Sequence, residues 1–182
     1  MMKTQLLVSA LSGVALLALS ACGGSEPKSA TETDTASAES GSSPWDVYAS
    51  PWDHESDAVT RTDSGLEYIV LKNGSECEEG PTESDRAIVH YEGRLIDGTV
   101  FDASFKRGEP TNFPANRVIS GWTEALGLMC PGDDWLVYLP SDIAYGQSPR
   151  PGGPIKPGDD LIFRMVLLAD ISASDWTGES FK

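Results

Sequence analysis

Short apolar stretches bounded by turn residues recur along the chain. Residues 66–71 alternate apolar and polar positions with the period of a half-buried β-strand and run into Lys72-Asn73-Gly74. The next stretch mixes β-branched and aromatic residues and is followed by Asp97-Gly98, which favours a tight hairpin turn. The pattern predicts strands that pair in an antiparallel sheet. The four predicted strands are residues 66–71, 87–95, 135–139 and 161–168.

One further stretch repeats its apolar residues at helical spacing. Four of them fall on one face of a helix over residues 122–129, and Pro131-Gly132 ends it. Residues 146–160 contain four Pro and four Gly and are predicted to form a loop. Several strands with one short helix predict an α+β fold in which an antiparallel sheet wraps around the helix. The helical apolar positions are Trp122, Ala125, Leu126 and Met129.

The N-terminal residues follow neither pattern. Residues 1–21 have a Lys near the start, an apolar run too short for a comfortable membrane span, and small residues at the end, which predicts an export signal peptide. Residues 19–22 (Leu-Ser-Ala-Cys) match the bacterial lipobox, in which the cysteine is lipidated and becomes the mature N-terminus. The alternative is an ordinary signal peptide with an incidental Cys22. We favour lipidation, because a polar segment follows the cysteine at once.

Residues 22–61 are rich in Ser, Thr, Ala, Glu and Asp, which predicts a disordered acidic tether. One feature departs from this composition: Ser-Pro-Trp-Asp occurs at residues 43–46 and again at residues 50–53. The two tryptophans are expected to pack on the folded domain and form its leading edge. A short recognition motif for a partner is the alternative. The predicted folded domain is residues 62–172, with a tail at 173–182.

Charge and cysteine content narrow the range of functions. The formal net charge of −15 argues against nucleic-acid binding, which needs a basic patch. Three cysteines are present; if Cys22 carries lipid, Cys77 and Cys130 remain as a pair in an oxidising compartment. We predict a disulfide between them, with two unpaired thiols as the alternative. Neither His54 nor His90 has a neighbour at metal-ligand spacing, so no metal site is expected.

Five separated blocks combine aromatic residues with few charges, which is the composition of a small apolar pocket with a few oriented polar groups. Their order and spacing resemble the FKBP-type peptidyl-prolyl cis/trans isomerases. The resemblance covers roughly residues 62–172, and it implies the same α+β architecture. The blocks are Val89–Gly93, Asp97–Ser104, Ile119–Trp122, Ile143–Gly146 and Leu161–Phe163.

The resemblance implies a role for each residue of the pocket. Trp122 would be the floor beneath the prolyl ring, Tyr145 would donate its hydroxyl to the substrate carbonyl, and Asp102 would face the rotating carbonyl. Arg107 and the Tyr91 hydroxyl would keep the carboxylate charged. Any one of these aromatics could be an ordinary core residue; the joint pattern favours a pocket. The remaining wall residues would be Phe101, Val118, Ile119, Ile155 and Phe163.

These observations predict an isomerase that assists the folding of exported proteins and acts on X-Pro segments by desolvating and hydrogen-bonding a twisted amide. No cofactor is expected, because no bond is broken. The protein would be a monomer anchored by lipid in the cell envelope, in the outer membrane facing the periplasm, and macrolide inhibitors could occupy its pocket. The alternative function is a tethered chaperone or adaptor that grips Pro-containing segments without needing turnover.

Overall fold

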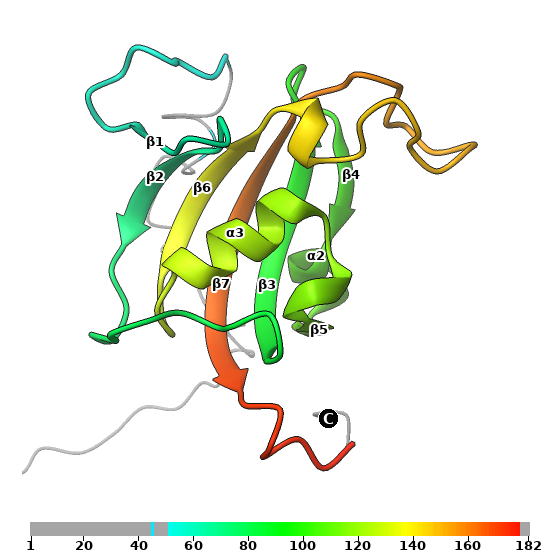
Figure 1. Ribbon diagram of the computed structural model, residues 1–182. Coiled ribbons are helices and arrows are strands. Elements are labelled where there is room, and N and C mark those ends of the chain that lie inside the picture. Colours follow the sequence, from blue (N-terminus) through cyan, green and yellow to red (C-terminus); the bar gives the residue numbers. More distant parts are fainter. Residues whose placement is uncertain (1–44, 46–50, 179–182) are drawn as a thin grey trace, which may run out of the picture. The chain divides into compact units, whose positions relative to one another are not determined.

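The computed structural model describes Trp45 and residues 51–178 (Figure 1). The predicted signal peptide and Cys22 lie outside the described residues. Within the described part of the chain, seven antiparallel strands form one sheet in the order β1-β2-β6-β7-β3-β4, with β5 also paired to β3. The strands are β1 (Thr60–Arg61), β2 (Glu67–Lys72), β3 (Arg86–Leu95), β4 (Val100–Ala103), β5 (Thr111–Pro114), β6 (Asp134–Leu139) and β7 (Leu161–Ile171).

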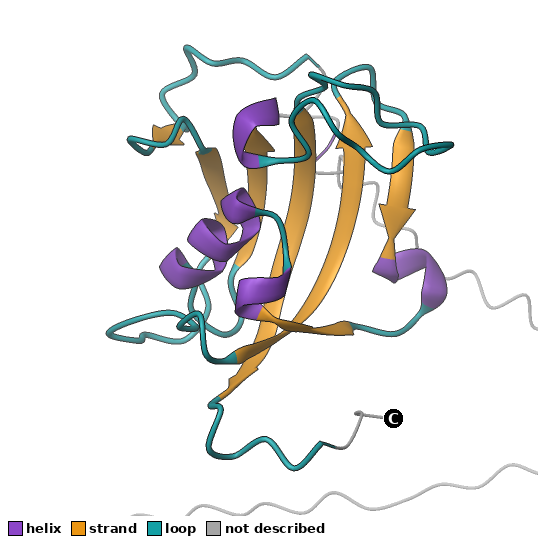
Figure 2. Cartoon of the chain, turned by 45° about the vertical axis from the view of Figure 1, so that its right-hand side comes forward, coloured by secondary structure: helices purple, strands orange, loops and turns teal. Residues whose placement is uncertain are grey.

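The main helix α3 (Ser120–Leu128) lies across one face of the sheet (Figures 1 and 2). Alternate residues of β6 and β7 point at it and are buried, as the period of two requires. The architecture confirms the predicted α+β fold with an antiparallel sheet around a short helix. The smaller helices are α2 (Ser104–Arg107) and the 3-10 turns η1 (Ala115–Arg117) and η2 (Ser141–Ile143).

Strand β3 has two different partners along one edge, and this arrangement creates the wall of a cavity. β5 pairs with Arg86–Val89, whereas β4 pairs with Glu92–Arg94. Between these ladders the backbone N–H of Tyr91 donates instead to the fully buried Ser104 Oγ at 2.7 Å. Because this hydroxyl satisfies the N–H that the strands leave unpaired, the sheet edge can divide here.

The opposite face of the sheet is covered by residues that precede the expected domain. Trp45 and Trp52 are buried there in a cluster with Ile69, Leu136 and Tyr138. The Trp52 ring stacks on Tyr138 with 5.7 Å between centroids. Both tryptophans therefore pack on the folded domain, as expected. Strand β6 is buried on both faces for this reason, which explains its uninterrupted apolar sequence.

The expected boundary between tether and domain at residues 61 and 62 is placed too late. Strand β1 pairs Thr60 with Tyr68, and Trp52 Nε1 donates to the carboxylate of buried Glu67 at 2.7 Å. Residues 51–61 therefore belong to the folded unit. The polar composition of this segment predicted disorder, whereas two tryptophans and one short strand attach it to the sheet. At the other end, part of the predicted tail also packs, since Arg86 lies over the Trp176 ring at 4.3 Å.

The predicted disulfide is present between Cys77 and Cys130, whose Cα atoms lie 5.7 Å apart. It joins the segment after β2 to the residues that follow α3. Asp133 reinforces the same corner, because its carboxylate accepts hydrogen bonds from the backbone N–H groups of Gly74 and Cys130. The C-terminal end of the helix is thus tied to the sheet beside it.

Candidate active site

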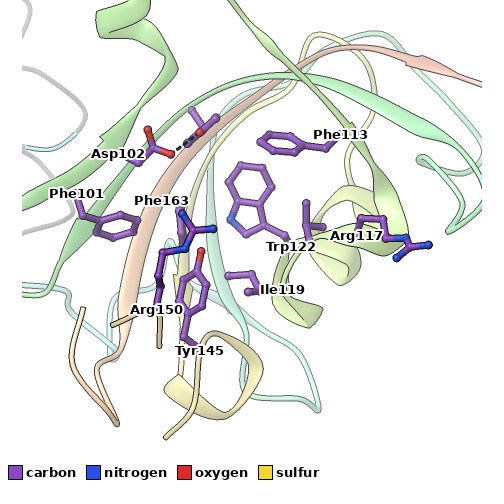
Figure 3. Close-up of a pocket in the computed structure, with 11 residues that line it drawn as sticks. Phe101, Asp102, Phe113, Arg117, Ile119, Trp122, Tyr145, Arg150 and Phe163 are labelled. Atoms are coloured by element: carbon purple, nitrogen blue, oxygen red, sulfur yellow. Dashed lines mark hydrogen bonds between the residues drawn. The ribbon is translucent and has the colours of Figure 1, made fainter. Parts of the chain in front are cut away.

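A cavity of about 500 Å³ opens between α3, the divided edge of the sheet and the loop after η2 (Figure 3). Trp122, near the start of α3, forms its floor and is 4% exposed. Three rings meet the indole nearly edge-on: Tyr91, Phe113 and Phe163, with centroids 5.1–5.4 Å away. This geometry suits the aromatic quadrupoles and fixes the indole plane. The floor is therefore a rigid apolar surface of the size of a small ring.

Gly93 on β3 lets two of the wall residues meet. A Cβ at this position would lie 2.5 Å from Phe101 Cζ and 2.7 Å from the Phe163 ring, so no other residue fits without displacing them. With hydrogen at this position, Phe101 packs edge-on against Phe163 at 5.6 Å. The strand therefore brings aromatic residues from β4 and β7 together on one wall of the cavity.

Asp102 on β4 supplies the carboxylate of the cavity (Figure 3). The Tyr91 hydroxyl donates to its Oδ2 at 2.6 Å, and the Arg107 guanidinium donates to its Oδ1 at 2.6 Å. Arg107 also donates to the Tyr91 hydroxyl at 3.0 Å, which closes a three-membered network. Because Arg107 is the last residue of α2, this helix holds the cation directly against the carboxylate.

The network keeps Asp102 ionised. Burial by itself would raise the pKa of Asp102, but the hydrogen bonds from Tyr91 and Arg107 outweigh it and hold that pKa below its usual value. The pKa of Tyr91 moves the opposite way, because burial and the neighbouring carboxylate disfavour a phenolate. Asp102 is therefore a fixed anion at neutral pH, oriented by two donors.

Tyr145, in the loop after η2, brings a second tyrosine hydroxyl to the cavity, besides that of Tyr91. Its ring is 41% exposed, and its hydroxyl has no hydrogen-bond partner among the described residues. Burial of the phenol and the charge of Asp102 raise the pKa of Tyr145, whereas Arg150 lowers it. The hydroxyl thus stays protonated and is free to donate to a bound carbonyl oxygen.

The structure gathers most of the site residues predicted from the sequence. Eight of them line the cavity, and Arg107 lies just behind it, bonded to Asp102. Ile155 was expected to line the cavity from the long loop. Instead it packs against the main hydrophobic core and does not line the cavity. The lining residues that were predicted are Tyr91, Phe101, Asp102, Val118, Ile119, Trp122, Tyr145 and Phe163.

Three lining residues were missed: Phe113, Arg117 and Arg150. Phe113 lies on the four-residue strand β5, too short for a periodic signal, although it is the aromatic residue closest before Val118. Arg117 and Arg150 lie on a 3-10 turn and on the Pro-rich loop, where sequence pattern does not define side-chain direction. Only the tertiary structure brings them to the cavity.

Within Trp45 and residues 51–178, no group of three or more His, Cys, Asp or Glu side chains is placed to hold a metal ion. The two histidines there have other partners: His54 contacts Glu67, and His90 contacts Ser104. The cavity offers an apolar floor, one fixed carboxylate and one free hydroxyl, with two arginines on its wall. This arrangement can bind a small apolar ring and a polar group beside it, and it can do so without covalent chemistry.

Such a cavity, between one helix and the divided edge of an antiparallel sheet, defines a class of small α+β binding domains. Family comparison then identifies the group within this class. The family model of FKBP-type peptidyl-prolyl cis-trans isomerases matches residues 77–168, about half of the chain. The chain belongs to this family, as its sequence blocks predicted.

Individual relatives agree with this assignment. Peptidyl-prolyl cis-trans isomerase Mip of Coxiella burnetii is 49% identical over 106 residues, which cover 58% of this chain and 45% of the relative. Outer membrane protein MIP of Legionella longbeachae is 49% identical over 107 residues, covering 58% and 44%. The crystal structure of FkpA from Escherichia coli superposes with a TM-score of 0.61 at 39% identity, covering 65% of this chain and 54% of that one. The chain spans about half the length of the curated relatives it matches.

Proposed function

We propose that this protein is a peptidyl-prolyl cis/trans isomerase that acts on exported proteins. The observation that carries the proposal is the cavity itself, in which an aromatic floor, a fixed carboxylate and a free hydroxyl line one space of about 500 Å³. Membership of the isomerase family supports the activity. The chemistry of the reaction explains why such a cavity suffices.

Rotation about an X-Pro bond breaks no bond and needs no nucleophile. Amide resonance sets a barrier of roughly 18–20 kcal/mol, and the uncatalysed exchange takes about 10–100 s. In the twisted transition state the amide has lost resonance and part of its dipole. A water-excluding apolar site therefore favours the twisted amide over the planar one, and hydrogen bonds matched to the twisted geometry add to this preference.

Each part of the cavity corresponds to one of these requirements. Trp122 would support the prolyl ring, and Phe101 and Phe163 would exclude water from one side of it. Tyr145 would donate to the carbonyl oxygen of the substrate backbone. Asp102 would face the rotating carbonyl with a charge whose direction is fixed by Tyr91 and Arg107. This division of roles uses the carboxylate and the free hydroxyl, and it gives no role to the two arginines that line the cavity, Arg117 and Arg150.

The proposed location is the bacterial cell envelope. The lipobox at residues 19–22 would attach the mature N-terminus to lipid, and residues 23–44 would serve as a spacer. The disulfide between Cys77 and Cys130 is consistent with an oxidising compartment. One relative is named an outer membrane protein, and we extend this location to the present chain as part of the proposal. No helix in the described part of the chain is both long enough and apolar enough to cross a bilayer.

The proposal is tested by NMR exchange or protease-coupled measurement on X-Pro peptides, with the protein extracted in mild detergent. The wild type should accelerate exchange in proportion to its concentration. Phe163→Ala should lose most of the activity, because it removes both a wall of the cavity and a ring that packs on Trp122. A matched control is Leu168→Ala on the same strand, since Leu168 is 43% exposed and does not line the cavity.

The same experiment separates the isomerase from a binding module. A tethered chaperone or adaptor would bind the peptides, measurable by intrinsic tryptophan fluorescence, without changing their exchange rate. An exchange rate that does not depend on protein concentration, or a Phe163→Ala variant as active as wild type while folded, would contradict the proposal.

A further inference from the structure

Two arginines line the cavity without a hydrogen-bonded or ion-paired partner among the described residues. Arg117, at the end of η1, and Arg150, in the loop after Tyr145, both contribute to its wall. Both side chains are exposed, and neither forms a hydrogen bond or ion pair with the residues that the structure describes. In Figure 3 they flank the floor: Arg150 lies on the side of Tyr145 and Phe163, and Arg117 lies on the far side of Trp122.

Their isolation contrasts with the other arginines of the domain. Four of these form ion pairs with a carboxylate, and the fifth, Arg86, donates to Asn112 and lies over Trp176. In an acidic protein an exposed arginine ordinarily pairs with a carboxylate, and this chain has 28 acidic residues against 13 basic ones. In the described part of the chain, the two cations beside the cavity are therefore unusual in having no ion-paired carboxylate. The ion-paired arginines are Arg61, Arg94, Arg107 and Arg164.

The carboxylate inside the cavity does not neutralise them. Asp102 forms an ion pair with Arg107 and accepts from the Tyr91 hydroxyl, and it forms no hydrogen bond or ion pair with Arg117 or Arg150. Among the residues that line the cavity, together with Arg107, the Asp102–Arg107 pair sums to no net charge and the two remaining arginines leave an excess of positive charge. A bound peptide would meet this excess on either flank of its proline.

The acidity of the rest of the chain does not cancel this local field. At physiological salt, exposed charges separated by more than about 8 Å are largely screened, so a bound substrate responds to the nearest groups. A carboxylate placed within contact distance of an arginine fork also gains hydrogen bonds that distant charges cannot offer. The arginines would therefore act on substrate residues directly beside the proline.

We propose that Arg117 and Arg150 make this site selective for X-Pro segments that carry Asp or Glu beside the proline. The inference rests on the proposed isomerase function and adds the substrate class to it. Since the two arginines lie on opposite flanks of the floor, one serves the residue before the proline and the other serves the residue after it. Successive residues of an extended peptide are about 3.3 Å apart, so both neighbours of a seated proline lie near the cavity edge.

The test compares matched peptides with blocked termini, so that the peptides of a pair differ only in the charge of one side chain. One pair has Glu or Gln before the proline, and a second pair has Glu or Gln after it. The ratio of kcat/KM for Glu over Gln is measured for wild type, Arg117→Gln, Arg150→Gln and the double variant. Lys156→Gln is the control, because it removes a cation from the same long loop at a residue that does not line the cavity.

In wild type at low salt, the ratio should be about 3–10 in each pair and should fall towards one at about 0.5 M salt. Each single variant should lower the ratio in one pair, and the double variant should bring both ratios to about one. Lys156→Gln should leave the ratios unchanged.

Two failures have different meanings. If no peptide is accelerated, the proposed isomerase function itself is contradicted. If Gln peptides are accelerated but the wild-type ratio is one, or the double variant keeps the wild-type ratio, the isomerase stands and the selectivity for acidic neighbours is overturned.

Discussion

At the scale of single residues, the site depends on which polar groups already have partners. Asp102 is held by two donors, whereas the Tyr145 hydroxyl has no partner in the described part of the chain. A satisfied group is rigid and keeps its charge, and an unsatisfied group is available to a ligand. The two residues therefore have different expected responses to substitution and pH.

Tyr145→Phe should lower kcat/KM for X-Pro exchange by about 3–30-fold, the cost of about one hydrogen bond, with little change in stability. The ring stays in place, and the lost hydroxyl has no internal partner, so the fold loses no interaction. Activity and urea unfolding of the same preparation measure the two effects. Loss of stability without loss of activity would show that the hydroxyl serves the fold and not the substrate.

Activity should not depend on pH between about pH 5 and pH 8, because the pKa of Asp102 lies below its ordinary value of about 3.9. Because the pKa of Asp102 is lower in the folded protein than in the unfolded chain, its carboxylate contributes to folding stability above the unfolded pKa. This contribution is lost as the pH falls through the folded pKa. A pH profile of kcat/KM, with circular dichroism to monitor folding, tests this. Asp102→Asn should be less active on this plateau and should lack the acid limb. A midpoint near neutrality in wild type would contradict the assignment.

At the scale of elements, the N-terminal segment is a structural part of the sheet. Glu67 on β2 is 3% exposed and accepts from Trp52, His54 and Arg61. Burial opposes ionisation, but these three hydrogen bonds outweigh it and lower the pKa of Glu67. One carboxylate therefore ties residues 52–61 to the sheet, and the tryptophans seal the face around it.

Glu67→Gln should lower the free energy of unfolding by about 1–3 kcal/mol, because the amide cannot accept from all three donors. The loss should be local first, so amide exchange in residues 51–61 should quicken more than in α3. Glu79→Gln, at an exposed residue that has no partner in the described chain, is the matched control. Unchanged exchange in residues 51–61 would mean that the tryptophans hold the segment without the carboxylate.

The disulfide acts on a second element, the C-terminal end of α3. It closes a loop across a sequence separation of 53 residues, for which chain entropy predicts about 4 kcal/mol of stabilisation. Reduction should therefore lower the melting temperature by about 10–20 °C while leaving isomerase activity at low temperature nearly intact. Neither cysteine lines the cavity. A large loss of activity in the folded, reduced protein would show that the bond positions Trp122.

At the scale of the whole molecule, the proposed lipid anchor would attach the domain to a membrane. A lipidated Cys22 would carry more than one acyl chain, which gives the stable anchoring that a single chain does not provide. Cys22→Ser should abolish acyl incorporation and shift the protein from the membrane fraction, or leave it there as uncleaved precursor. Mass spectrometry of the mature N-terminus and fractionation measure this. A wild-type protein without acyl mass at Cys22 would refute the anchor.

Much of the fold was predictable because its signals are local. The strand periods, the helix over residues 122–129 and its Pro-Gly stop were read from neighbouring residues and agree with β2, β3, β6, β7 and α3. The two-residue strand β1 and the four-residue strands β4 and β5 were not among the predicted strands, since elements so short have no period. Without β5, the sequence could not place Phe113 against Trp122.

Fold class, family and the floor of the site follow from the order of residues alone, because the spacing between aromatic blocks can be measured along the chain. The contacts of those blocks follow only from the folded chain: Trp45 and Trp52 cover the outer face of the sheet, Ile155 packs against the core, and Arg117 and Arg150 line the cavity. Burial and contacts depend on segments that are far apart in the sequence. The local sequence of a loop or a polar segment does not predict which distant part of the chain it will contact.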